Sequence, residues 1–234
     1  MTQELESYKN ALYEQLGRVG KAISSPRRLE LLSLLSQGER TVEILANEAG
    51  LTIANASQHL KVLKEARLVA TEKTGLYITY RLADESVISL LGSLEQLAKN
   101  RLAEIDQVLN NYLEAHGQLE SVDREELIKR IVAGNVTVID VRPSEEFKAG
   151  HIPGAISVPL IELEGYDPQL DKTKDVVAYC RGQYCVLAVN AVEHLQHLGY
   201  RAVRLDESIQ EWKARGLPIE TGNDSTNGSN EKES

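Results

Sequence analysis

Both cysteines of the chain lie in one short segment, Cys180-Arg181-Gly182-Gln183-Tyr184-Cys185. The apolar run 176–179 before it predicts a strand, and the apolar spacing after it predicts a helix. A thiol between a strand end and a helix start meets backbone N–H groups, which favour the thiolate. Cys180 is therefore predicted to be a reactive nucleophile, and the alternative is an inert buried thiol.

The residues after Cys180 predict a site for an anion. The side chain of Arg181 and the loop amides would each stabilise a thiolate, and afterwards an anionic persulfide. The amides in question belong to Gly182, Gln183, Tyr184 and Val186.

Cys185 leaves two interpretations open. It resolves an oxidised Cys180 through a disulfide or a polysulfide bridge. Alternatively its side chain only packs in the helix, because disulfides tolerate little misalignment.

A second group of polar side chains lies upstream, on a predicted helix from Ile53 to about Ala66 that Thr52 caps. It follows two shorter predicted helices, one opened by Pro26 and one capped by Thr41. The third helix would expose its N-terminal half to DNA bases. The candidate DNA contacts on it are Thr52, Asn55, Ser57, Gln58, His59 and Lys61, and for His59 a purely structural hydrogen bond is an equal alternative.

Two alternating strands, 68–72 and 77–82, flank Lys73-Thr74-Gly75 and predict a β-hairpin wing. Lys73 and Arg81 would touch DNA phosphate from this wing. Arg27 and Arg28 open a different helix, so phosphate contact is expected of them rather than base contact.

The composition is that of a globular protein, with 42% hydrophobic and 26% charged residues and a net charge of −9. Residues 1–82 carry 11 Lys+Arg against 9 Asp+Glu, a balance of +2, whereas the rest of the chain is acidic. Phosphate contact is therefore expected in this first part. Two cysteines make no disulfide framework, and no signal peptide or membrane span is evident, so we expect a cytoplasmic protein.

Three parts are expected: residues 1–116 with the DNA-reading helices, an α/β domain at 117–220, and a disordered tail at 221–234. Residues 84–115 are predicted to form one long amphipathic helix. A lone helix of this length needs a packing partner, which favours a homodimer.

The segment from Ser57-Gln58-His59 to Leu68-Val69 resembles the signature of the ArsR/SmtB winged-helix repressors. The resemblance implies a mainly α-helical winged helix-turn-helix and a homodimer that pairs through the first helix and the 84–115 helix. It also implies a twofold-symmetric double-stranded DNA operator, with Ser57, Gln58 and His59 at the bases. Residues 41–49 hold no Cys or His and 84–115 no His, so no metal and no cofactor is expected.

Residues 119–220 are similar to rhodanese domains. The resemblance rests on Asp140-Val-Arg142, the run 151–155, Cys180-Arg181-Gly182 and Gly216-Leu-Pro218. It implies a three-layer α/β fold with a central parallel sheet, and Cys180 as the nucleophile that becomes a persulfide. Arg142 would bind a small anionic sulfur donor such as thiosulfate or a polysulfide, or else form a structural salt bridge with an acidic residue.

The sequence thus predicts a multidomain transcriptional regulator, a repressor, whose rhodanese domain senses or transfers sulfane sulfur through Cys180. One alternative is primarily a sulfurtransferase enzyme that the winged helix localises. A lesser alternative is an arsenate-related reductase or regulator, because related folds use a loop with one Cys and one Arg to hold an oxyanion.

Overall fold

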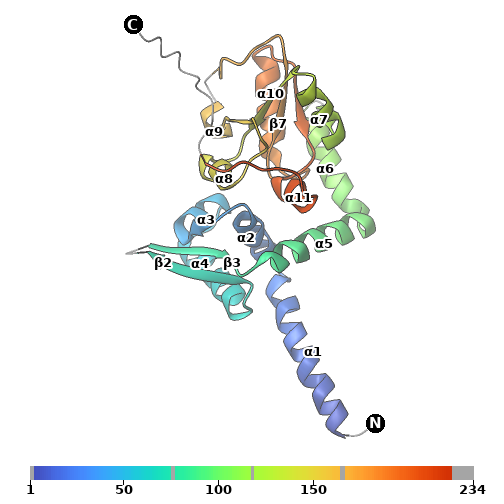
Figure 1. Cartoon of the computed structure of the whole chain (residues 1–234). Coiled ribbons are helices and arrows are strands. Elements are labelled where there is room, and N and C mark those ends of the chain that lie inside the picture. The colour runs from blue at the N-terminus through green and yellow to red at the C-terminus, as the bar shows by residue number, and fades with distance from the viewer. Residues whose placement is uncertain (1–2, 75–76, 117–118, 164–166, 223–234) are drawn as a thin grey trace. The chain divides into compact units, whose positions relative to one another are not determined.

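The computed structural model describes residues 3–74, 77–116, 119–163 and 167–222, and Figure 1 shows their elements. Contacts divide the chain into two compact units, Met1–Arg101 and Leu102–Ser234. Nearly all of the predicted tail at 221–234, and the tip of the predicted wing, lie outside the described residues. None of the described helices is both long enough and apolar enough to cross a membrane.

The first unit contains the three predicted helices and the predicted hairpin. Its elements are α1 (Gln3–Ile23), α2 (Pro26–Ser36), β1 (Arg40–Thr41), α3 (Val42–Glu48), α4 (Ile53–Glu65), β2 (Val69–Thr74), β3 (Tyr77–Leu82) and α5 (Glu85–Arg101). Thr52 caps α4 as expected, since its hydroxyl accepts a hydrogen bond from the Asn55 amide at 3.2 Å. The strands form an antiparallel sheet in the order β1-β3-β2. This is the winged helix-turn-helix that the sequence predicts.

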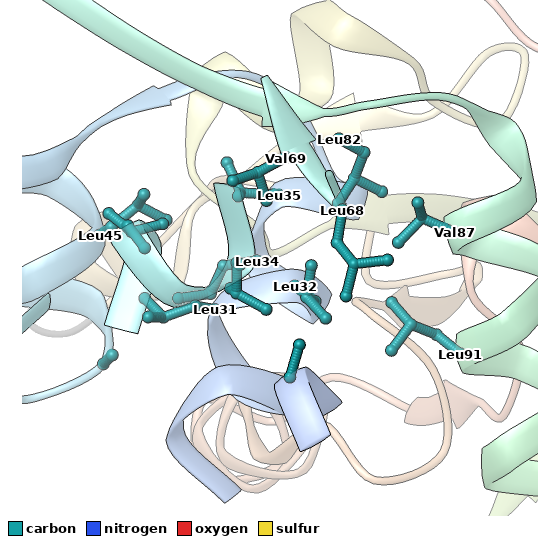
Figure 2. Close-up of a cluster of buried hydrophobic side chains, with 14 residues drawn as sticks. Leu31, Leu32, Leu34, Leu35, Leu45, Leu68, Val69, Leu82, Val87 and Leu91 are labelled. Atoms are coloured by element: carbon teal, nitrogen blue, oxygen red, sulfur yellow. The ribbon is translucent and has the colours of Figure 1, made fainter. Parts of the chain in front are cut away.

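One apolar cluster holds the first unit together (Figure 2). Leu31 and Leu32 on α2 and Leu60 and Leu63 on α4 are fully buried. The spacing of three between Leu60 and Leu63 places both on one side of α4. Each such leucine contributes about 1.5–3 kcal/mol through burial. The opposite side of α4 therefore does not pack in this core and is available to contact another molecule.

The second unit is an α/β domain with a five-stranded parallel sheet in the order β4-β8-β7-β5-β6. Its elements are α6 (Ala103–Ala115), β4 (Ser121–Val122), α7 (Arg124–Val132), β5 (Val136–Asp140), α8 (Ser144–Ala149), β6 (Ile156–Ser157), α9 (Leu160–Leu163), β7 (Asp175–Tyr179), α10 (Val186–His197), β8 (Ala202–Leu205) and α11 (Ile209–Ala214).

The alternation of β7 builds two cores, one on each face of its sheet. Val176, Ala178 and Cys180 pack with α9 and α10, whereas Val177 and Tyr179 pack on the other face with α7, α8 and α11. Helices on both faces of a parallel sheet make the predicted three-layer architecture. The β7 strand also directs the Cys180 side chain toward α10.

The long helix predicted over 84–115 is wrong, because α5 ends at Arg101 and α6 begins at Ala103. Leu102 between them has an extended backbone, with φ −118° and ψ 97°. Lys99 and Arg101 favour a helix C-terminus here, and Glu104 and Asp106 a helix N-terminus. Charges of both signs therefore favour a break.

The break also changes the structural unit to which α6 belongs. The Tyr112 hydroxyl on α6 donates a 2.8 Å hydrogen bond to Oδ1 of Asn190 on α10. The second unit accordingly starts at Leu102, whereas the sequence places the boundary near His116. The helix expected to serve the first domain is thus divided between the two units.

Candidate functional site

The two cysteines stand at opposite ends of the loop that joins β7 to α10. Cys180 follows the last residue of β7, and Cys185 is the N-cap of α10. The loop turns at Gly182 with φ 113°, a backbone conformation that residues with a Cβ rarely adopt. A Cβ added there would also stand 3.4 Å from the Ser208 Cβ. Gly182 thus lets the loop turn tightly beside the N-terminus of α11.

The Cys180 thiol is buried among backbone carbonyl oxygens. Only 1% of the residue is exposed, and its Sγ lies 3.4 Å from the carbonyl oxygen of Cys185 and 3.9 Å from that of Gly182. Carbonyl oxygens accept from a thiol and repel a thiolate. Burial, together with the neighbouring Cys185, raises the pKa of Cys180 well above its usual range.

Cys185 interacts closely with Cys180, and its pKa is shifted in the opposite direction. The hydrogen bond from the Cys180 side chain lowers the pKa of Cys185 to about 6, against the effect of burial. The amides of Arg181 and Leu187 and the positive charge of Arg181 act in the same direction. A position at a helix N-terminus has this effect on thiols generally. The sequence predicts the reactive thiolate at Cys180, and which of the two thiols is ionised stays a prediction.

Arg181 is paired with a buried carboxylate that the sequence analysis missed. Its Nε lies 3.2 and 3.1 Å from the two oxygens of Glu146, and Nη2 also contacts Glu146. Glu146 is 1% exposed. Its position four residues after Arg142 on a predicted helix start was the available signal. The charge that Arg181 brings to the loop is therefore largely neutralised.

Arg142 lies beneath this ion pair, with its side chain fully buried. Its Nε donates to Oδ1 of Asp140 at 2.9 Å, and Nη2 donates to the Gly150 carbonyl at 2.7 Å. Of the two interpretations left open by the sequence, this favours the structural salt bridge. Arg142 does not reach an anionic donor in this arrangement, because its donors face protein oxygens. Asp140 is likewise a structural residue here, because its carboxylate is the buried ion-pair partner of Arg142.

The remaining loop residues form the surface around Cys185. Tyr184 is 39% exposed and Val186 is 42% exposed, while Gln183 is half-buried. Both exposed side chains flank Cys185 directly in the chain. The N-cap thiol is therefore the part of the pair nearest to solvent.

In the first unit, α4 carries the predicted DNA-reading face. Asn55, Gln58 and Lys61 are exposed on it, and Ser57 and His59 are half-buried. The Thr52 hydroxyl is used as the helix cap, so its role there is structural first. Helices of this class present such a face to the DNA major groove.

Arg28 is held by backbone carbonyls, whereas Arg27 is exposed, with 52% of its side chain accessible to solvent. Arg28 bonds the carbonyls of Lys21, at 2.8 Å, and Ala22 at the end of α1. Arg27 pairs with Glu30 at 2.8 Å. The last carbonyls of a helix lack internal partners, which explains why a following arginine binds them.

On the wing, Lys73 is exposed, as a phosphate contact requires. Arg81 is half-exposed and stands 3.9 Å from Glu39, a carboxylate that sequence reasoning did not consider. Within the described part of the chain, no group of three or more His, Cys, Asp and Glu side chains could hold a metal ion.

Comparisons with known proteins match a family to each of the two units. Residues 25–71 match the family model "Bacterial regulatory protein, arsR family", and residues 123–215 match the rhodanese-like domain. The chain is 42% identical over 214 residues to HTH-type transcriptional regulator Rv0324 of Mycobacterium tuberculosis, covering 92% of this chain and 94% of that protein. The chain belongs to the ArsR family of transcriptional regulators and carries a C-terminal rhodanese domain.

Two further similarities are confined to one unit each. The rhodanese domain is 31% identical over 103 residues to a sulfurtransferase of Allochromatium vinosum, covering 43% of this chain and 94% of that protein. The ArsR domain is similar to the solution structure of a homodimeric winged helix-turn-helix fragment from Mycobacterium bovis. That match has 41% identity and a TM-score of 0.39, and it covers 40% of this chain and 87% of the fragment.

Proposed function

We propose that this ArsR-family regulator senses sulfane sulfur through its rhodanese domain, which holds the sulfur as a persulfide on Cys180. The observation that carries the proposal is the pair of thiols on one loop. Cys180 is enclosed by the sheet and the loop, and its Sγ lies 3.4 Å from the carbonyl oxygen of Cys185. A buried position at a strand end would protect a persulfide from water and from reductants.

The charge of the loop favours a persulfide or a polysulfide as the donor over thiosulfate. Glu146 neutralises most of the Arg181 charge, and Arg142 is occupied by Asp140. A dianion would therefore meet little net positive charge here, whereas a singly charged donor needs less. In each case the proposed sulfur donor is a small anion.

The DNA partner is a twofold-symmetric operator that α4 reads through Ser57, Gln58 and His59, with Lys73 on the phosphates. Twofold symmetry requires a homodimer. Five large apolar side chains on α1 are exposed and support such a dimer: Leu5, Tyr8, Leu12, Tyr13 and Leu16. DNA binding and free thiols both fit a cytoplasmic protein.

The test compares DNA binding before and after sulfur transfer. DNA selected for binding from a random-sequence pool is titrated with reduced protein and with protein treated with glutathione persulfide. We expect the dissociation constant to change by about fivefold or more, the usual lower size of an allosteric effect. The double variant Cys180→Ser/Cys185→Ser should show no change. Superimposable curves for treated and reduced wild-type protein would refute sensing.

A sulfurtransferase activity is the second candidate, supported by the similarity to the Allochromatium vinosum enzyme. Steady turnover of thiosulfate with cyanide as acceptor, abolished in Cys180→Ala, would favour it. The neutralised Arg181 instead leads us to expect slow thiosulfate turnover.

A further inference from the structure

The loop between β7 and α10 turns back on itself and brings its two cysteines together. The backbone turns at Gly182, and the amide of Cys185 donates a 3.0 Å hydrogen bond to the Gly182 carbonyl, which closes the turn. The Sγ atom of Cys180 lies 3.4 Å from the carbonyl oxygen of Cys185. In an extended chain the same five steps would span about 17 Å. The turn therefore places Cys185 beside Cys180.

Both side chains also pack in one apolar cluster. Cys180 belongs to the buried cluster that α10 covers, and Cys185 packs against this cluster from the N-cap of the same helix. Each of the two thiols also contributes to the pKa shift of the other. The chain contains two cysteines in all, so Cys185 is the one partner that a single chain can offer to Cys180 for a disulfide.

We infer that Cys185 is the resolving thiol of the loop: it attacks a persulfide on Cys180 and closes an intramolecular disulfide. This rests on the proposed function, because it starts from a persulfide on Cys180. Cys180 keeps its role as the residue that takes up sulfur. Of the two interpretations that the sequence leaves open for Cys185, the inference takes the first.

Burial favours a neighbouring thiol over any reductant in solution. Cys180 is 1% exposed, so a large thiol from solvent has little access to a persulfide on it. Cys185 is already in the loop and is itself half-buried, so it needs no path of entry. A reacting group that is held in place acts at a high effective concentration. The internal reaction should therefore be faster than reduction from outside.

The chemistry balances in one step. The Cys185 thiol gives its proton to the terminal sulfur of the anionic persulfide, and its sulfur attacks the Sγ of Cys180. A new S–S bond forms between the two residues, and the bond to the terminal sulfur breaks. That sulfur leaves as hydrosulfide with the electron pair. The sulfane sulfur is reduced and the two cysteines are oxidised, so no external oxidant is needed.

The disulfide would also change the start of α10. It removes the ionisable thiol of Cys185 at the N-cap of this helix. The charge of that thiol contributes to the raised pKa of Tyr112 on α6. Resolution of the persulfide would therefore alter the electrostatic environment of α6 as well as the loop.

Trypsin makes the disulfide visible, because it cleaves at Arg181 between the two cysteines. Cys180 falls in peptide 175–181 and Cys185 in peptide 182–201. Reduced full-length protein is mixed with glutathione persulfide in the absence of oxygen, and excess donor is removed by gel filtration. Samples are then quenched at increasing times with an alkylating reagent and digested. Mass spectrometry follows the intact chain and both peptides, and released sulfide is measured in parallel.

We expect a persulfide on peptide 175–181 that decays into a disulfide joining the two peptides within one chain, with about one sulfide released per chain. In Cys185→Ser the persulfide on Cys180 should last about tenfold longer, because no resolving thiol is left. Equal persulfide lifetimes in the two proteins, with no joined peptides in the wild type, would overturn the inference and leave the proposed function intact. Neither a persulfide nor a disulfide in the wild type would overturn both.

A matched pair of glycine variants tests the turn. Gly182→Ala should displace the turn and slow disulfide formation severalfold, because φ is 113° and the added Cβ would stand 3.4 Å from the Ser208 Cβ. Gly134 has a similar backbone, with φ 69°, but it follows α7 and nothing lies within 4 Å of an added Cβ. Gly134→Ala should therefore form the disulfide at the wild-type rate. Equal rates in the two variants would show that the turn does not bring the thiols together, which would overturn the inference.

Discussion

At the scale of residues, the site depends on a chain of buried charges as much as on its thiols. Glu146 joins the guanidinium of Arg181, in the loop, to that of Arg142, which Asp140 also holds. All but Arg181 are essentially inaccessible to solvent. A buried charge is tolerated only while it is paired, so each member makes the others necessary. These ion pairs thus support the loop that carries Cys180.

Replacing Glu146 by alanine tests this support. Removing one partner of a buried pair leaves an uncompensated charge, so we expect the free energy of unfolding to fall by about 3 kcal/mol or more. The neighbouring Glu145 is exposed, and its replacement by alanine should change stability by only about 0.5 kcal/mol. Urea unfolding of both variants is the measurement. Equal stabilities would mean that Glu146 does not support the loop.

At the scale of elements, α6 lies in the second unit and contacts the N-terminal half of α10. Tyr112 on α6 bonds Asn190, and its ring stacks on His116 with centroids 4.2 Å apart. Negative charge on Glu193 and on Cys185 adds to the raised pKa of Tyr112, whose first cause is burial. The charge at Cys185 thus affects the pKa of Tyr112 on α6. We propose that this effect carries a change at Cys185 toward α5, which Leu102 alone separates from α6.

Replacing Tyr112 by phenylalanine keeps the ring but removes the hydroxyl that bonds Asn190. Because only the link between α6 and α10 is lost, the DNA affinity of the reduced protein and its sulfur uptake should stay unchanged. The persulfide-dependent shift in DNA affinity should shrink severalfold. Tyr13→Phe, at an exposed position on α1, is the matched control. A full shift in Tyr112→Phe would exclude this link as the route.

At the scale of the whole molecule, the proposed regulator needs a second copy of itself. Leu5, Tyr8, Leu12 and Leu16 follow one side of α1 and are exposed, whereas Ala22 at the other end of this helix is buried in the core. An apolar helical stripe of this kind usually has a packing partner. A dimer would also place two α4 helices on the two halves of one operator.

A charge on this stripe should separate the proposed dimer. We expect Leu12→Glu to shift the protein from dimer to monomer in analytical ultracentrifugation at micromolar concentration. Affinity for the operator should drop by about tenfold or more, because each monomer then binds one half-site. Asn10→Glu adds the same charge on the opposite side of α1 and should remain dimeric. A dimer that survives Leu12→Glu would place the interface elsewhere.

Local sequence patterns were enough to predict much of the fold and of the loop that carries the cysteines. The Thr52 cap, the inward Leu60 and Leu63, and the hairpin of the winged helix follow from periodicity and capping, which act over a few residues. The strand–loop–helix around Cys180 is equally local. Arg28 and Glu146 were not predictable in the same way, because their partners depend on how separate elements come together.

The sequence by itself determined the two folds, the loop that carries both thiols and the exposed face of α4, since each depends on residue order over short spans. Only the tertiary structure decided that Cys180 is buried among carbonyl oxygens, that Arg142 is enclosed with Asp140, and that α6 groups with the second unit. Burial and long-range contacts control these features, and neither is written in local spacing.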